Sequence, residues 1–92
     1  MTFADVKRIM KKHDIWDENY SIEEDKPLAE VALCLDRIKD KYRFYIVERD
    51  VIYKQYLFDT EDAACKMFLT EMALDSPELE KYLRPEKKRR GD

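Results

Sequence analysis

The side chains that most often do chemistry in proteins are few in this sequence. Histidine occurs once, at His13, and cysteine twice, at Cys34 and Cys65. His13 continues an apolar stripe at helical spacing and has no second histidine or nearby cysteine at metal-ligand spacing, which favours a packed structural role over a ligand or a base. A cysteine nucleophile would need a base beside it, and only the fold could bring His13 to either thiol. No catalytic or metal-binding site is predicted.

The two cysteines lie on apolar-patterned segments far apart in the sequence. Free cysteines in such segments are usually small buried hydrophobes. A disulfide between them is the alternative, because the sequence does not give the distance between their Cβ atoms. The segment Met1–His13 carries charges throughout and lacks the apolar centre of a signal peptide, so we expect a reducing, cytoplasmic setting.

The acidic run Glu23, Glu24 and Asp25 is the densest group of carboxylates. It lacks the alternating oxygen ligands and central glycine of a calcium loop. The single glycine of the chain lies near the C-terminus, which argues against a glycine-rich loop for phosphates. The sequence therefore predicts no cofactor, and we interpret the acidic run as solvent-exposed side chains.

Charge is divided unevenly along the chain. The net charge of −3 is the sum of −6 over residues 1–83 and +3 over residues 84–92. An acidic body repels nucleic-acid phosphates and suits a basic protein partner. The basic tail could contact nucleic acid, but it has no interleaved aromatic residue to stack on a base. No apolar run is long enough to cross a membrane.

Hydrophobic periodicity predicts one α+β domain over residues 1–83, followed by a mobile basic tail over 84–92. The simplest architecture is a three-stranded antiparallel meander with helices packed on one face, in the order α-β-β-β-α-α. The predicted elements are a helix over Thr2–His13, an acidic connection over Asp14–Lys26, strands over Glu30–Ile38, Tyr42–Glu48 and Val51–Phe58, a helix capped near Thr60 with an apolar stripe from Ala64 to Met72, and a short helix over Glu78–Leu83.

Two features of the predicted sheet stay open at this point. Asp40-Lys41 is a plausible first turn, whereas Arg49-Asp50 lacks the glycine that a two-residue turn favours. The third strand carries apolar side chains on both faces, so a helix or a partner could cover either side. Three of the six tyrosines, Tyr45, Tyr53 and Tyr56, lie beyond the core alternation. Tyrosines on an open sheet face are typical interface anchors, although core tyrosines under helices are the alternative.

Two segments resemble a known family. Residues 45–50 read YIVERD and residues 57–69 read LFDTEDAACKMFL. They are similar to small immunity proteins of bacterial polymorphic-toxin and contact-dependent inhibition systems, in which an aromatic strand ending in Glu-Arg-Gly precedes a Phe-Asp-Thr/Ser-Glu-x-x-Ala-Cys helix start. The leucine-rich strand at Ala32–Leu35 also fits, and the resemblance covers about Glu30 to Met72. Asp50 stands where the family has glycine.

The resemblance implies a non-enzymatic inhibitor that binds the C-terminal domain of a cognate toxin in the cytoplasm, and an acidic surface would complement a basic, nuclease-like toxin. We expect occlusion of the toxin's active site, with no nucleic acid or membrane involved; the sequence does not predict the oligomeric state. The predicted contact residues are Glu23, Glu24, Asp25, Tyr45, Glu48, Asp50 and Tyr53. The alternatives are a small regulatory or nucleic-acid-binding module acting through the basic tail, and an enzyme, which would need a polar cleft.

Overall fold

The first helix, α1 (Phe3–Lys12), begins and ends as its sequence predicts. The computed structural model describes residues 1–24 and 26–83, so Asp25 and the predicted tail lie outside the described residues. Thr2 is the N-cap: its hydroxyl accepts a hydrogen bond from Asp5 N, and the Asp5 carboxylate accepts one from Thr2 N. This reciprocal capping box satisfies backbone donors at the start of the helix. The predicted range Thr2–His13 consists of this helix and its two capping residues.

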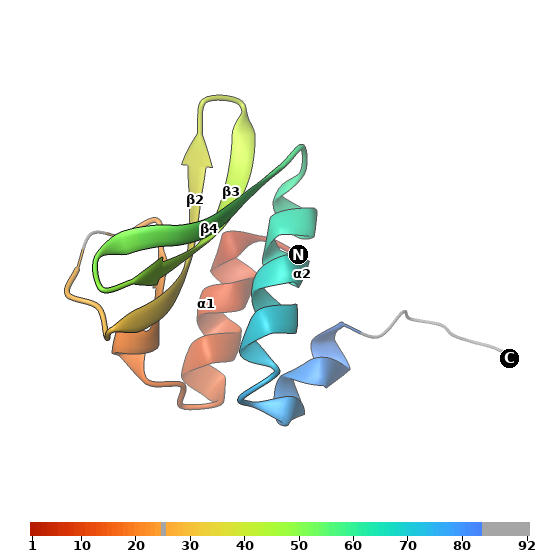
Figure 1. The fold of residues 1–92 in the computed structure, drawn as a ribbon. Coiled ribbons are helices and arrows are strands. Elements are labelled where there is room, and N and C mark those ends of the chain that lie inside the picture. The colour runs from red at the N-terminus through yellow and green to blue at the C-terminus, as the bar shows by residue number, and fades with distance from the viewer. Residues whose placement is uncertain (25, 84–92) are drawn as a thin grey trace, which may run out of the picture.

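The second helix, α2 (Glu61–Met72), lies beside α1 against the same face of the sheet (Figure 1). The Thr60 hydroxyl accepts a hydrogen bond from Ala63 N at 3.1 Å, and acids occupy the first turn, where the helix dipole stabilises them. The side chain of Glu61 also accepts a hydrogen bond from Phe3 N, at 2.6 Å, so the starts of the two helices are joined.

Three long strands form the antiparallel meander that the sequence predicts: β2 (Val31–Ile38), β3 (Lys41–Glu48) and β4 (Val51–Phe58). A β-bulge interrupts the β3–β4 pairing, since Ile46 pairs with Lys54 while the next residue, Val47, pairs with Ile52. Strand β4 is an edge strand and extends beyond the helices in Figure 1.

The predicted number of strands was wrong, because the sheet has a fourth, parallel strand. Strand β1 (Tyr20–Ile22) pairs with β2 in the register Tyr20 to Leu33, giving the order β1-β2-β3-β4 in a mixed sheet. The region read as an acidic connection thus contains this strand and a 3-10 turn, η1 (Asp17–Asn19). All three residues of β1 are buried, and three residues between acids are too few to show an alternating pattern.

The last predicted helix is also corrected in type. Residues Pro77–Tyr82 form a 3-10 helix, η2, where the sequence predicted a helix over Glu78–Leu83. Pro77 at the start of η2 has a fixed φ angle and has no N–H to donate a hydrogen bond to an earlier carbonyl. Leu79 is fully buried, so this short element still closes one end of the core.

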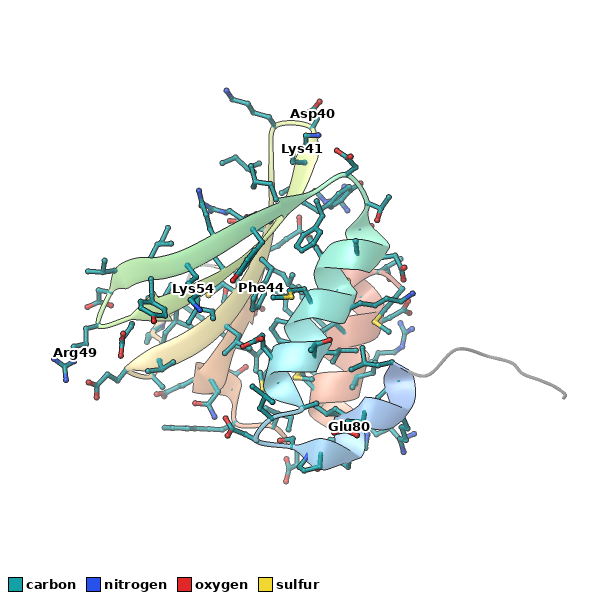
Figure 2. The ribbon with its side chains drawn as sticks, turned by 45° about the vertical axis from the view of Figure 1, so that its right-hand side comes forward. Asp40, Lys41, Phe44, Arg49, Lys54 and Glu80 are labelled. Atoms are coloured by element: carbon teal, nitrogen blue, oxygen red, sulfur yellow. The ribbon has the colours of Figure 1, made fainter. Side chains whose placement is uncertain are left out.

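The core lies between the sheet and the two helices. Phe44 of β3 is fully buried and packs edge-on against Phe68 of α2, with 6.3 Å between ring centroids. Figure 2 shows Phe44 between the sheet and α2. The buried residues of this core are Phe3, Val6, Ile9, Met10, Tyr20, Ile22, Leu35, Phe44, Ala64, Cys65, Phe68, Leu69, Met72, Ala73 and Leu79.

Both tight turns of the meander use left-handed backbone without glycine. Lys39 has φ 58° in the first turn, which is Lys39-Asp40 and lies one residue before the predicted Asp40-Lys41. Arg49 and Asp50 have φ 52° and 66° in the second turn. Positive φ at both central residues defines a type I′ turn, which matches the twist of the strands that it joins. The second turn therefore lies where the sequence predicted it.

Candidate functional site

His13 is held by an aromatic neighbour. Its Nε2 atom lies 2.8 Å from the Tyr82 hydroxyl, and the two rings meet edge-on at 5.6 Å. The contact joins the end of α1 to the end of η2, which is the packed role that the sequence favoured.

Both cysteines are free and buried, which confirms the first interpretation of them and rules out the disulfide alternative. Burial raises the pKa of the Cys65 thiol to about 12 and also raises that of Cys34. A thiol must ionise to act as a nucleophile, so neither site is arranged to activate it.

Two further features are absent from residues 1–24 and 26–83. There, no three His, Cys, Asp or Glu side chains come together in a way that could hold a metal ion. No helix in the same residues has both the length and the apolar character needed to cross a membrane.

The predicted acidic loop is partly neutralised by neighbouring cations. Glu23 lies 3.3 Å from the Arg37 guanidinium, and Glu24 lies 3.5 Å from Lys26 Nζ. Lys26 is mostly buried and also pairs with Asp17 at 2.7 Å. Both glutamates remain exposed, but each carboxylate is already paired with a cation of the same chain.

The structure separates this loop from the other predicted acids. Ile22, next to Glu23, pairs with Leu35, whereas Glu48 pairs with Val31. Four residues of a strand span about 13 Å. The acidic loop and the acids of the β3–β4 hairpin therefore lie toward opposite ends of the sheet, and a single small contact would not cover both.

Tyr45 has neighbours on the face of the sheet away from the helices. Arg43 lies 4.2 Å from the centre of the Tyr45 ring and makes two hydrogen bonds to Asp36, at 2.9 and 2.7 Å. A third hydrogen bond joins Arg43 to Gln55 at 3.2 Å. Burial raises the pKa of the Tyr45 phenol to about 12. Tyr45 is thus half-covered within a polar cluster, and only part of its surface is available to a partner.

Strand β4 carries the largest uncovered apolar surface in the described chain. Every residue from Val51 to Leu57 is exposed, and Val51 and Tyr53 are exposed by 66% and 62%. Glu48 and Asp50 are also exposed, beside this strand. We name this region the hairpin surface and define it as Glu48, Asp50, Val51, Ile52, Tyr53 and Leu57.

The sequence predicted Glu48, Asp50 and Tyr53 as contact residues but not Val51, Ile52 and Leu57, which the structure also exposes. The signal was present, because β4 has apolar side chains on both faces. The pattern left open whether a helix or a partner covers each face. In the structure the helices cover mainly the central strands, and only Phe58 at the end of β4 is partly buried.

A second, basic surface lies on α1. An open groove of about 860 Å³ runs beside Ile9 and Tyr82, and its cations are Arg8, Lys11 and Lys12. Asp5 also lines it and pairs with Arg8. The charged side chains that line the groove are mostly basic, so its chemistry is that of a shallow cationic surface.

Comparisons with protein-family models, with curated proteins and with solved structures find no match to this chain. The interpretation of the site therefore rests on its own residues and geometry.

Proposed function

We propose that this chain is an immunity protein, which binds a cognate toxin domain and neutralises it by covering the toxin's active site. The observation that carries the proposal is the exposure of β4, where five large apolar side chains face solvent: Val51, Ile52, Tyr53, Tyr56 and Leu57. These side chains lie on both faces of β4, and exposed apolar groups gathered beside polar ones are typical of a protein interface. The segments at residues 45–50 and 57–69, which resemble immunity proteins, flank this strand.

The charge beside this surface supports a basic partner. Within residues 1–24 and 26–83, neither Glu48 nor Asp50 has an ion-pair partner, whereas Glu23 and Glu24 do. Acids whose charge is not already neutralised attract a cationic surface more strongly. We therefore place the main contact at the hairpin surface and give the acidic loop a smaller, peripheral part.

The mechanism follows from these two components. The tyrosine and aliphatic side chains would be buried in the centre of the complex, where apolar contacts contribute most of the affinity. Glu48 and Asp50 would meet the cations with which a nuclease-like toxin holds its substrate. The toxin would then lose access to substrate without any chemical step on either protein.

Charge reversal at one hairpin, with the other hairpin as control, tests this proposal. The double variant Glu48→Lys/Asp50→Lys changes two exposed acids beside β4, and Asp40→Lys changes an exposed acid in the β2–β3 turn. Figure 2 shows Asp40 and Arg49 at separate hairpin tips, far from each other. The partner to test is the C-terminal domain of a large secreted protein encoded by a neighbouring gene.

We expect the double variant to bind this domain at least about tenfold more weakly and with a smaller dependence on salt. Asp40→Lys should bind like the wild type. Equal affinities for all three proteins would place the contact elsewhere, and Glu23→Lys/Glu24→Lys then tests the acidic loop directly.

One observation favours a second candidate, an anion-binding module. The groove on α1 presents Arg8, Lys11 and Lys12, and the described chain ends next to it, shortly after Tyr82. Such a module would bind single-stranded nucleic acid with an affinity that falls steeply between low and physiological salt. Removal of residues 85–92 would abolish that binding, whereas binding of a toxin by the hairpin surface would lose little.

A further inference from the structure

The two edges of the sheet are protected to very different degrees. Edge strand β1 has only three residues, and all are buried. Edge strand β4 has eight residues, and its only charged side chain is Lys54. An exposed, long and mostly apolar edge strand is a template for pairing with another strand, which proteins usually block with charge or proline. Strand β4 lacks both kinds of protection along most of its length.

The backbone of β4 has hydrogen-bonding groups to offer on this edge. In an antiparallel hairpin, pairs that exchange hydrogen bonds alternate with pairs that do not, starting from the pair that closes a two-residue turn. Glu48 and Val51 are the pair that closes the turn. Beyond the bulge, Gln55 pairs with Tyr45, and Leu57 pairs with Arg43. Counted in this way, the N–H groups of Gln55 and Leu57 point away from β3.

The strand also fits a second copy of itself. Two antiparallel edge strands related by a two-fold axis perpendicular to the sheet keep their helices on one common face. In an antiparallel pair, two residues that lie directly opposite each other point to the same face of the sheet. The two-fold axis must therefore pass between one residue and the same residue of the second copy. The two registers with the greatest overlap are centred on Lys54 and on Gln55.

Charge distinguishes these two registers. A register centred on Lys54 would oppose two ammonium groups, which is destabilising. A register centred on Gln55 opposes two uncharged amides: each Oε1 already accepts a hydrogen bond from Arg43, and each Nε2 can donate to the other copy. It also sets each Lys54 opposite Tyr56 of the second copy, where the cation can lie against an aromatic ring. Tyr56 is already held by stacking on Phe44, with 6.2 Å between ring centroids.

We propose that the partner of this edge is a second copy of the chain, paired antiparallel through β4 with the two-fold axis at Gln55. The two four-stranded sheets then form one continuous sheet. The pairing is centred on Gln55, and the bulge falls at Tyr53, next to Lys54. This inference does not rest on the proposed function, since Glu48 and Asp50 lie near the hairpin tip and the acids of both copies stay open to a toxin.

Cross-linking by a single cysteine tests the register. In the proposed dimer the two Gln55 Cα atoms are about 5.5 Å apart, within the range of about 4.4–6.8 Å that a disulfide needs. The two Lys54 Cα atoms are about 8 Å apart and their side chains lie on the other face. Gln55→Cys should therefore form a covalent dimer under mild oxidation, and Lys54→Cys, the matched control, should not. The native thiols are buried and give little background.

Sedimentation velocity over a dilution series tests the pairing itself. We expect the wild-type chain to dissociate from dimer to monomer on dilution. Gln55→Pro removes an outward N–H while leaving the hydrogen bonds to β3, so it should raise the dissociation constant at least about tenfold. If that variant does not fold, the cysteine pair still decides the question.

Three results would overturn the inference. The wild-type chain could stay monomeric at every concentration, or it could form a dimer that Gln55→Pro leaves intact. Cross-linking could also be equal for the two cysteine variants. A chain that is monomeric alone and whose β4 amides become protected from exchange only when the toxin domain is added would show that the edge pairs with the toxin.

Discussion

Arg43 holds three other side chains in place on the face of the sheet away from the helices. It bonds to Asp36 through two nitrogen atoms, to Gln55 through a third, and lies over the Tyr45 ring. The guanidinium and the carboxylate are only 17% and 25% exposed. The hydrogen bonds that Arg43 donates to Asp36 raise the pKa of Arg43, which keeps the cation charged. Removing one partner of an ion pair this buried is destabilising, because the other charge is left unpaired.

We predict that Arg43→Met lowers the free energy of unfolding by about 1–3 kcal/mol, because Asp36 is left without its partner in a half-covered site. Adding Asp36→Asn should recover part of the loss. Urea denaturation of the three proteins measures this, with Arg8→Ala, at an exposed i,i+3 pair, as the control that stays close to wild type. A double variant less stable than Arg43→Met would contradict the account.

Burial of Cys65 makes stability depend on pH on the alkaline side. The thiol has a pKa of 9.0 when unperturbed and about 12 in the folded chain, because burial disfavours the thiolate. Above about pH 9 the unfolded chain loses its proton first and the folded chain keeps it. The stabilisation is therefore complete below pH 9 and is lost as the pH rises toward 12.

We predict that each such group lowers the free energy of unfolding by about 1.4 kcal/mol per pH unit in this window. Cys65→Ala should be less stable at neutral pH, since a buried side chain is shortened, but its stability should fall less steeply with pH. Denaturation curves between about pH 8 and pH 11 give both slopes. The same slope for variant and wild type would mean that the thiol ionises freely in the folded chain.

At the scale of elements, the β3–β4 hairpin combines a turn, a bulge and an exposed strand. Its turn places Arg49 and Asp50 in left-handed backbone, which favours glycine because a Cβ atom is crowded there. Family members that this chain resembles have glycine at the second position. This chain forms the same turn with Asp50 at that position. The turn therefore contributes a negative charge to the hairpin surface, at some cost in stability.

Asp50→Gly should therefore raise the free energy of unfolding by about 0.5–1 kcal/mol. Asp40→Gly in the other turn is the control: φ is not positive at Asp40, so glycine there should give no gain. Thermal or urea denaturation measures both. Because Asp50→Gly also removes an acid, it should weaken toxin binding while it stabilises the fold. A less stable Asp50→Gly variant would mean that Asp50 makes a stabilising contact in the turn.

Most elements could be predicted from periodicity and caps. The strands over Val31–Ile38 and Val51–Phe58 and the capped starts of α1 and α2 follow local rules of alternation and hydrogen bonding. Strand β1 could not be predicted, because its pairing with β2 is a contact between segments that only the fold brings together. The 3-10 type of η2 was not predicted either, although Pro77 at its start is visible in the sequence.

The candidate site was predicted less completely. Glu48, Asp50 and Tyr53 are exposed on one hairpin, as an interface would need. The ion pairs of Glu23 and Glu24 and the cover over Tyr45 involve residues distant in sequence, so single residues could not reveal them. Asp25 lies outside the described residues.

Over the whole molecule, two sets of apolar side chains lie in different surroundings. One set fills the space between the sheet and the helices, and the other lies on β4 in contact with solvent. The body carries a net charge of −6 over residues 1–83. An apolar strand left exposed next to acids is the feature on which the proposed association with another protein rests.

Titration of toxin activity with the purified chain tests this central claim most directly. On the proposed function, the toxin to assay is the C-terminal domain of a secreted protein whose gene neighbours this one, tested on its own substrate while the chain is added in steps. The account predicts that activity falls linearly and reaches its floor at one chain per toxin domain. Full toxin activity in the presence of excess chain would contradict it.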